Sequence, residues 1–429
     1  MKDTQARKMA SKNALNKWAA TRIYNSGSLV LIGDSRLAQM YATYGTTNKT
    51  RNGFNFLTQG FAQAGQRVTV EAMLATSGQR SDQYLAPAQQ QAAFATRALW
   101  AIVYGIVNDV AATGNTIDYW TVTIKPFVQA WIAAGRKVIL ITEAGANTLT
   151  TAAQRGAVFK YNQQIREFCR TTPNAVLFDM ASLVLTPGQA MTLNSNYSGD
   201  GTHINLMAGG NAAGVAFGAL LNQLFPPCDG LVKSAGEVYS NGAVQWFPNP
   251  LWTTTTGGVA TGTNETWNGN VPAGITATAT TAGATSITAT NAAGTYGNAL
   301  QLAITTAQAG VVRVQYDLSL IGVENPGDVF YSSAKLGVAA GASNFQWCST
   351  YLESNRAGVT RQVEDGYAVG SAVNGALPSG AYSWVSETER LVIDSGARGW
   401  LTGSLRAYFA GAGSATLIVE RLGVFRVQP

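Results

Sequence analysis

Five short apolar segments alternate with helix-like segments in the first half of the chain, and they constrain its fold most strongly. They occupy residues 28–33, 67–74, 98–104, 137–142 and 175–179. Their apolar residues do not alternate with polar ones, which is typical of strands buried on both faces. Helical spacing marks segments 117–134 and 151–170, and residues 36–44 are also helix-like. This order predicts an α/β fold, a parallel sheet between layers of helices.

The composition changes after residue 228, where Thr, Gly and Asn become frequent and no long helical pattern occurs. Thr alone accounts for 17 of the 54 residues from 253 to 306. Alternating apolar and polar residues predict strands at 299–306, 311–320, 390–393 and 415–419. We therefore expect three parts, namely a basic N-terminal helical segment at 1–28, an α/β domain at 29–228 and an all-β, jelly-roll-like sandwich at 229–429.

The formal net charge of +6 is concentrated near the N-terminus. Six basic residues and one acidic residue lie within residues 1–25, whereas residues 229–429 carry more acidic than basic side chains. Nucleic-acid binding needs a basic surface along a domain, and no reader motif is present, so we expect no nucleic-acid partner. The N-terminal segment either packs on the α/β domain or attaches the chain to a larger assembly, and the sequence leaves both open.

Metal-ligating side chains are few, because the chain has one histidine and only three cysteines, Cys169, Cys228 and Cys348. A zinc site, a haem pair or an iron–sulfur cluster needs more of these ligands at closer spacing, so we expect no metal and no cofactor. No uninterrupted apolar stretch of about 18 residues occurs, so we expect no membrane span. The basic N-terminal segment lacks the apolar core of a secretory signal peptide.

A serine directly follows the first apolar segment, in Gly33-Asp34-Ser35. Ligands of open α/β sheets bind outside the carboxyl ends of the strands, so we expect the hydroxyl of Ser35 to face a crevice. Its backbone N–H would lie at a helix N-terminus, where the helix dipole favours a developing oxyanion. A turn followed by a helix N-cap is the alternative explanation, because Ser and Asp favour both.

The single histidine, His203, makes a catalytic role for Ser35 more probable than a structural one. A serine needs a base within hydrogen-bond reach to act as a nucleophile, and that base needs an acceptor that fixes its tautomer. Asp200 lies three residues before His203 in Asp-Gly-Thr-His and can reach Nδ1 while Nε2 faces Ser35. The alternative is an ordinary surface or capping histidine.

Two further polar positions follow other predicted strands and can serve as oxyanion donors. Gly78 offers a backbone N–H that no side chain screens, and Asn108 offers a carboxamide N–H. Together with the N–H of Ser35 they make three donors for a negatively charged oxygen. Each also has an ordinary explanation, a turn glycine for Gly78 and a loop or cap residue for Asn108.

These four blocks, Ser35, Gly78, Asn108 and Asp200/His203, occur in the order found in the SGNH (GDSL-like) hydrolase superfamily, which residues 29–225 resemble. The resemblance implies a flavodoxin-like three-layer fold and ester hydrolysis, so that the protein would be a carboxylic ester hydrolase. It also implies the roles. Ser35 would be nucleophile and first oxyanion donor, Gly78 and Asn108 the other donors, and His203 the base oriented by Asp200.

Two positions depart from the family pattern. Arg36 follows the serine where the family often has an aliphatic residue, so a cation is expected beside the site, in contact with an acidic sugar or in solvent. In the third block two residues separate Gly105 from Asn108, where the family usually has one. The expected assignment of Asn108 depends on this longer loop.

The second half suggests a glycan substrate, because aromatic side chains stack on sugar rings and six of the ten tryptophans lie there, Trp246, Trp252, Trp267, Trp347, Trp384 and Trp400. Packing in the core is the simpler explanation for any one of them. A Thr/Gly/Asn-rich β domain behind an SGNH domain is similar to phage or prophage tail-associated esterases. This resemblance implies O-acetylated bacterial polysaccharide as substrate, phage tail components as partners and a virion-tail or extracellular location.

Two other functions remain open at this point. The protein could be a non-catalytic glycan-binding adhesin or tail structural protein, or an esterase for small or lipid esters. A homo-oligomer is compatible with the tail resemblance, although the sequence contains no trimerising heptad.

Overall fold

The computed structural model describes residues 25–427, apart from 46–47, 114–116, 189–190, 228–229, 239–244, 260–261, 263, 317, 319–323 and 369–373. The chain forms two compact units, and each unit consists of three separate stretches of the sequence. Unit 1 comprises Met1–Leu37, Val68–Glu143 and Gly156–Phe178, and unit 2 comprises Ala38–Arg67, Ala144–Arg155 and Asp179–Pro429. Of the N-terminal segment expected at 1–28, residues 1–24 lie outside the described part.

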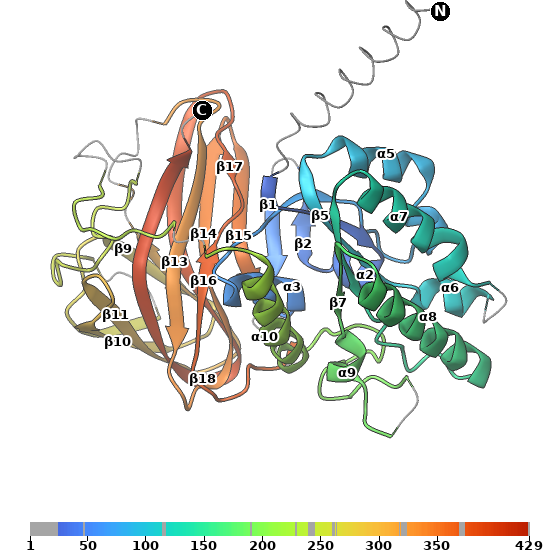
Figure 1. Cartoon of the computed structure of the whole chain (residues 1–429). Helices are drawn as coiled ribbons and strands as arrows, with labels where there is room; N and C mark the ends of the chain where they lie inside the picture. Colours follow the sequence, from blue (N-terminus) through green and yellow to red (C-terminus); the bar gives the residue numbers. More distant parts are fainter. Residues whose placement is uncertain are drawn as a thin grey trace, which may run out of the picture. The chain divides into compact units, whose positions relative to one another are not determined.

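Unit 1 is built on a five-stranded parallel sheet in the order β4-β1-β5-β6-β7 (Figure 1). The strands are β1 (Asn25–Gly33), β4 (Thr69–Met73), β5 (Ala98–Tyr104), β6 (Lys137–Ile141) and β7 (Ala175–Phe178). Counted along the sheet they run 2-1-3-4-5, which is the flavodoxin-like order. The α/β fold expected from the five apolar segments is confirmed, and each strand coincides with one of them.

The central strands are buried on both faces, as their unbroken apolar sequences predict. Leu29, Val30 and Leu31 of β1 and the pair Ile139 and Leu140 of β6 are fully buried. Successive side chains of a strand point to opposite faces of the sheet. Because both faces are buried here, apolar residues are favoured at every position.

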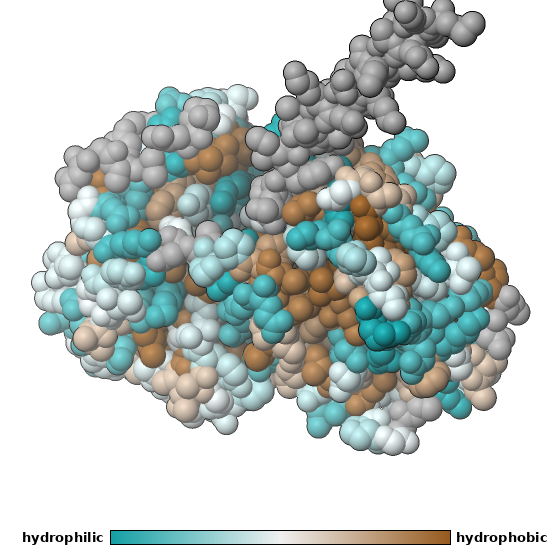
Figure 2. All heavy atoms as spheres, in the orientation of Figure 1, coloured by the Kyte–Doolittle hydropathy of each residue, from teal (hydrophilic) through white to brown (hydrophobic). Residues whose placement is uncertain are grey.

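Helices of unit 1 connect the strands. They are α2 (Ser35–Ala38), α4 (Ser81–Tyr84), α5 (Pro87–Ala95), α6 (Val107–Thr113), the π-helix η1 (Trp120–Ile124), α7 (Lys125–Ala133) and α8 (Ala152–Thr171). Segments 117–134 and 151–170 are therefore helical, as predicted. Hydrophilic residues gather over α8 in Figure 2, and its inward side chains, such as Val158 and Ile165, are buried.

Unit 2 contains the all-β part of the chain together with three helices and two strands from the first half. The first-half elements are β2 (Tyr41–Tyr44), β3 (Lys49–Asn52), α3 (Phe56–Gln63), α9 (Met180–Val184) and α10 (Met207–Leu224). The strands of the second half are β8 (Glu265–Gly269), β9 (Ile275–Thr280), β10 (Thr285–Ala293), β11 (Asn298–Thr306), β12 (Gly310–Tyr316), β13 (Val329–Val338), β14 (Ser343–Arg356), β15 (Val359–Tyr367), β16 (Tyr382–Glu387), β17 (Leu391–Val392) and β18 (Arg398–Val427).

The long strand β18 belongs to two layers of strands (Figure 1). Its first part, up to Ser414, pairs with β12 and β14, and its second part, from Gly413, pairs with β11 and β13. A strand that bends from one layer into the next is a known way to form the corner of a sandwich. The pairs are antiparallel except β8 with β10 and β3 with β15, so the expected all-β C-terminal domain is confirmed as a large mixed sheet.

Most tryptophans of the second half pack in the core of unit 2. Trp246, Trp252, Trp347 and Trp384 are buried, and Trp347 stacks on Trp384 with ring centroids 4.6 Å apart. Trp400 is 37% exposed. Trp267 also packs against this core, so packing accounts for five of the six tryptophans, and Trp400 is the one that stays exposed.

Residues 36–44 are not one helix, so this part of the sequence prediction is wrong. Helix α2 ends at Ala38, and Tyr41–Tyr44 form strand β2. Strand β2 pairs with β3, which in turn joins the C-terminal strand β15. Tertiary pairing decides here, because aromatic and β-branched residues such as Tyr41 and Thr43 are good strand formers once a partner strand is present.

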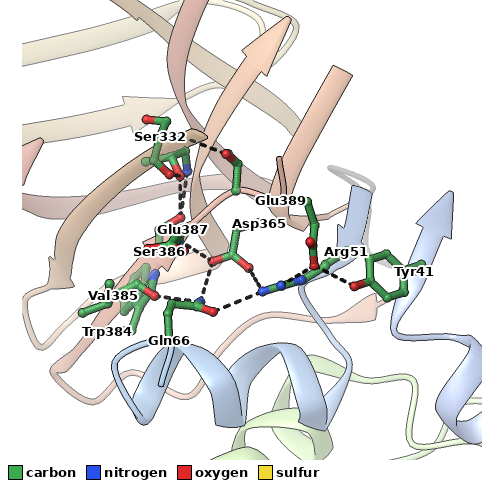
Figure 3. A network of polar contacts seen from close by, with 12 residues as sticks. Tyr41, Arg51, Gln66, Ser332, Asp365, Trp384, Val385, Ser386, Glu387 and Glu389 are labelled. Carbon is green, nitrogen blue, oxygen red and sulfur yellow. Dashed lines mark hydrogen bonds and ion pairs between the residues drawn. The ribbon is translucent and has the colours of Figure 1, made fainter. Parts of the chain in front are cut away.

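A buried polar network joins these inserted strands to the C-terminal sheet within unit 2 (Figure 3). Arg51 donates to Asp365 at 3.0 Å and to Glu389 at 2.5 Å. Tyr41 donates to Glu389 at 2.7 Å, and Gln66 donates to Asp365 at 3.0 Å. All five side chains are buried, and the single guanidinium of Arg51 compensates part of the charge of the two carboxylates.

The two compact units do not follow the domain boundaries expected at 29–228 and 229–429, because residues 38–67, 144–155 and 179–228 group with the C-terminal strands. Pairing of β3 with β15 explains this grouping for the first of these segments. Within the described part of the chain, no helix is long and apolar enough to span a membrane.

Candidate active site

Ser35 lies where β1 ends and the chain turns sharply into α2. The turn is held by Asp34, whose Oδ1 accepts the N–H of Arg36 at 3.0 Å and whose carbonyl accepts the N–H of Leu37 at 3.2 Å. Gly33 is required before this turn, because a Cβ at this position would lie 2.0 Å from the carbonyl oxygen of Tyr104 on β5. Ser35 itself is 8% exposed at the carboxyl end of the sheet.

Gly78 lies on the loop after β4, beside the end of β1. The N–H of Thr76 donates to the carbonyl of Gly33 at 3.1 Å, which fixes this loop next to the turn that carries Ser35. Gly78 has a φ of +78°, and no heavy atom lies within 4 Å of the place where a Cβ would be. The space where a Cβ would lie is therefore open, and a ligand could approach the backbone of Gly78 from that side.

Asn108, on the first turn of α6, contacts both neighbouring loops. Its Nδ2 donates to the carbonyl of Gln79 at 3.0 Å and lies 3.5 Å from Oδ2 of Asp34. The structure thus brings the loops of Ser35, Gly78 and Asn108 together at the carboxyl ends of three neighbouring strands. The longer spacing between Gly105 and Asn108 does not prevent this arrangement.

Asp109, which the sequence analysis did not single out, holds α6 to the loop of Gly78. Its buried carboxylate accepts the N–H of Ser81 at 2.9 Å and the hydroxyl of Ser81 at 2.7 Å. Burial raises the pKa of Asp109 to about 7, against the opposing effect of these hydrogen bonds. The available signal was the acidic residue that directly follows Asn108 in the sequence.

Arg36 is buried in an internal ion pair, which differs from both expected settings, contact with an acidic sugar and exposure to solvent. Its side chain is 3% exposed and forms an ion pair with Glu143, which is fully buried. The guanidinium also lies over the ring of Tyr104, 5.7 Å from its centroid. A cation neutralised inside the protein in this way is part of the support of the site rather than a substrate contact.

Asp200 and His203 form a hydrogen-bonded pair on one tight loop. Oδ2 of Asp200 lies 2.7 Å from Nδ1 of His203, while Oδ1 accepts the backbone N–H groups of Thr202 and His203 at 2.8 Å each. Partial burial opposes ionisation of Asp200, but the hydrogen bonds from His203 and Thr202 outweigh it and lower its pKa to about 2. The carboxylate therefore stays ionised and favours the tautomer that carries a hydrogen on Nδ1, in which the lone pair of a neutral ring lies on Nε2.

The site residues are divided between the two units. Ser35, Gly78 and Asn108 belong to unit 1, and Asp200 and His203 belong to unit 2.

Comparison with known families agrees with this chemistry. Residues 31–207 match the family model of the GDSL-like lipases and acylhydrolases. This part of the chain is a GDSL-like acylhydrolase domain. The GDSL-like domain includes every candidate residue from Ser35 to His203, and the protein is a carboxylic ester hydrolase. No curated protein sequence matches the chain.

Solved structures similar to the chain include further proteins of this class. A GDSL-like lipase from Bacteroides thetaiotaomicron is 18% identical over 50% of this chain and 95% of its own, with a TM-score of 0.34. A carbohydrate acetylesterase from Sinorhizobium meliloti is 12% identical over 46% and 97%, with a TM-score of 0.31. A xylan-binding domain from Paenibacillus barcinonensis is 14% identical over 34% and 83%, with a TM-score of 0.22. Because these scores are low, the assignment of the GDSL-like domain rests on the family match.

Proposed function

We propose that this protein is a serine esterase that removes O-acetyl groups from a bacterial surface polysaccharide through an acetyl-enzyme on Ser35. The observation that carries the catalytic part is the 2.7 Å contact between Asp200 and Nδ1 of the single histidine, His203. A carboxylate in this position sets the tautomer of the ring and stabilises the imidazolium that forms during acyl transfer.

In the proposed first half-reaction, Oγ of Ser35 attacks the acetyl carbonyl and its proton passes to Nε2 of His203. The carbonyl oxygen becomes an oxyanion that accepts from the N–H of Ser35, the N–H of Gly78 and Nδ2 of Asn108. The tetrahedral intermediate expels the sugar hydroxyl, which takes the proton from His203, and the acetyl group stays on Ser35.

In the second half-reaction, water attacks the acetyl-enzyme and gives its proton to His203. The same three donors hold the second oxyanion, and its collapse releases acetate and returns the proton to Ser35. Asp200 stays ionised throughout, because its pKa of about 2 lies far below that of a group that exchanges protons near neutral pH.

The glycan part of the proposal is supported by the β domain that accompanies the esterase. Aromatic side chains that keep an exposed face are the usual contacts for sugar rings, and Trp400 on β18 is 37% exposed. A virion-tail or extracellular location belongs to the same proposal, since surface polysaccharide is met there. Its support is the Thr-rich β domain next to an esterase domain.

The proposal is tested by measuring acetate release from a panel of purified O-acetylated bacterial polysaccharides, with Ser35→Ala as the blank. We expect the wild type to release acetate from at least one polysaccharide. Ser35→Ala should release no more acetate than a mixture without enzyme. His203→Ala is a clean companion, because no other histidine can replace the base. Release that persists in Ser35→Ala would overturn the mechanism.

A series of p-nitrophenyl esters of increasing acyl length tests the substrate class. A marked preference for acetyl supports deacetylation, whereas a preference for acyl chains of eight or more carbons points to lipid esters and contradicts the glycan proposal. Binding to polysaccharide without any esterase activity would instead indicate an adhesin.

A further inference from the structure

Glu143 is a buried carboxylate at the carboxyl end of β6, close to the nucleophile loop but outside every motif discussed so far. It follows Thr142 directly after the strand and has no exposed surface. Strand β6 is the neighbour of β5, which is the neighbour of β1, so the carboxyl ends of these three strands lie in a row. The loops that carry Ser35 and Asn108 begin at the ends of the other two strands.

The two oxygens of Glu143 reach these two loops separately. Oε1 forms the ion pair with Nη1 of Arg36, the residue next to Ser35. Oε2 accepts the backbone N–H of Ile106 at 2.8 Å, two residues before Asn108. One side chain therefore connects the turn that carries the nucleophile with the segment that carries an oxyanion donor.

Glu143 is itself held in place by Asn162 on α8. Its backbone N–H donates to Oδ1 of Asn162 at 2.7 Å, and its carbonyl accepts Nδ2 of Asn162 at 2.9 Å. Asn162 is buried in the middle of the twenty-residue helix α8, which spans Ala152–Thr171. Because both backbone groups of Glu143 are tied to a long helix, its carboxylate has a fixed origin from which it reaches Arg36 and Ile106.

We propose that Glu143 is a positioning residue of the esterase, which sets the distance between the Ser35 nucleophile and the Asn108 oxyanion donor through Arg36 and Ile106. The inference rests on the proposed function, because it gives Glu143 a role in positioning residues of the same active site. Oxyanion stabilisation depends on donors that are placed in advance, and a misplacement of about 1 Å can lower a rate about 100-fold.

The pair with Arg36 also has an electrostatic consequence. Both side chains are buried, so removal of one leaves the other as an uncompensated charge inside unit 1. A loss of stability is therefore expected for either single variant, and activity has to be separated from stability. Glu143→Gln is the conservative change, because its single carboxamide oxygen can keep one of the two contacts, the one from Ile106 N–H or the one from Arg36. Glu143→Ala loses both contacts.

A matched control exists in the same unit. Arg136, just before β6, is also fully buried. It donates to the carbonyl groups of Phe94, in the last turn of α5, and Thr96, directly after α5, at 2.9 and 3.1 Å. It lies before the amino end of β6, whereas Glu143 lies after the carboxyl end. Arg136→Met therefore removes a buried charged side chain of unit 1 at the opposite end of β6 from Glu143.

The experiment compares wild type, Glu143→Gln, Glu143→Ala, Arg36→Met, the double variant Arg36→Met/Glu143→Ala and Arg136→Met. Each is assayed with p-nitrophenyl acetate well below its own Tm, and Ser35→Ala is the blank. We expect Glu143→Ala to lower kcat about 100-fold with KM changed less than about threefold, because positioning acts on the transition state. The kcat of Glu143→Gln should be at least about tenfold higher than that of Glu143→Ala. The kcat of Arg136→Met should stay within about twofold of the wild-type value.

The double variant distinguishes a shared role from two separate ones. If Arg36 and Glu143 act as one connection, its kcat falls no further than that of Glu143→Ala, and the two single effects are not additive. An active wild type whose Glu143 variants keep kcat, or lose it only as Arg136→Met does, would overturn this inference alone. A wild type with no activity above Ser35→Ala would overturn the proposed function and this inference with it.

Discussion

The carboxylate of Asp200 lies 2.7 Å from Nδ1 of His203, and the same carboxylate accepts the backbone N–H of that histidine at 2.8 Å. Both contacts are possible because the two residues are three positions apart on one loop. The ring is therefore oriented by its own chain segment, independently of any contact with the nucleophile. This relationship is the basis of the first prediction.

Asp200→Asn should impair catalysis far more than stability. The carboxamide oxygen can still accept the N–H groups of Thr202 and His203, so the loop is expected to keep its shape. It no longer carries the charge that stabilises the imidazolium, and the ring can take the wrong tautomer, so we expect kcat to fall on the order of 1,000-fold. Esterase kinetics together with thermal unfolding check this, and a Tm loss that parallels the loss of activity would contradict it.

The buried carboxyl of Asp109 should make the protein less stable as the pH rises. Its pKa is about 7 in the folded state and about 3.8 in the unfolded chain, so the folded state binds the extra proton between these values. Stability is then highest near pH 4 for this group and falls as the pH rises through 7. The expected loss across this range is on the order of 4 kcal/mol.

Asp109→Asn tests this dependence, because the carboxamide oxygen can accept from Ser81 at every pH. We expect the variant to show a flatter urea-unfolding free energy between pH 4 and 8 than the wild type, and to be the more stable of the two at pH 8. Parallel curves for the two proteins would show that Asp109 does not titrate in this range.

Gly33 and Gly78 should respond differently to the same substitution. A Cβ on Gly33 would overlap the backbone of β5, which cannot move without breaking the sheet, so we expect Gly33→Ala to cost about 3 kcal/mol or more. A Cβ on Gly78 has open space, and only the positive φ opposes it, at about 1 kcal/mol. Urea unfolding of both variants checks the order, and equal losses would contradict it.

The network around Arg51 should be worth far more than an exposed ion pair. Arg51→Met leaves Asp365 and Glu389 without their buried partner, and we expect a loss of about 3–5 kcal/mol. The exposed pair of Arg170 and Glu167 provides the control, since Arg170→Met should leave the unfolding free energy almost unchanged.

The loss caused by Arg51→Met should also depend on pH. Burial raises the pKa of Asp365 to about 6 even with Arg51 present, and removal of the guanidinium can only raise it further. The variant can therefore neutralise this carboxyl by protonation at pH 5, and does so less completely at pH 8. We expect the deficit in unfolding free energy to be smaller at pH 5, and a deficit that grows on acidification would refute this account of the network.

The local sequence pattern was sufficient to predict those parts of the structure that depend on residues close together in the sequence. The five strands of unit 1 were predictable because strands buried on both faces have unbroken apolar sequences, as in Leu29–Leu31. The pairing of Asp200 with His203 was predictable because both lie on one short loop. In these cases the residues that determine the structure are close together in the sequence.

Contacts between distant residues were not predictable in the same way. Arg36 meets Glu143 from 107 positions away, so a single sequence could not distinguish an internal ion pair from a substrate contact. Residues 41–44 form a strand only because β3 and β15 supply partners, and β15 begins more than 300 residues later. Pairing between distant strands also explains why residues 38–67 belong to unit 2 and not to unit 1.

The central claim, an acetyl-enzyme on Ser35, is tested most directly by trapping it. The protein is mixed with p-nitrophenyl acetate, quenched in acid within the burst phase and digested, and the acetylated peptide is located by mass spectrometry. We predict an acetyl group on Ser35 in the wild type, with no such adduct and no burst in His203→Ala. An acetyl group on another residue, or a burst of the same size in Ser35→Ala, would contradict the account.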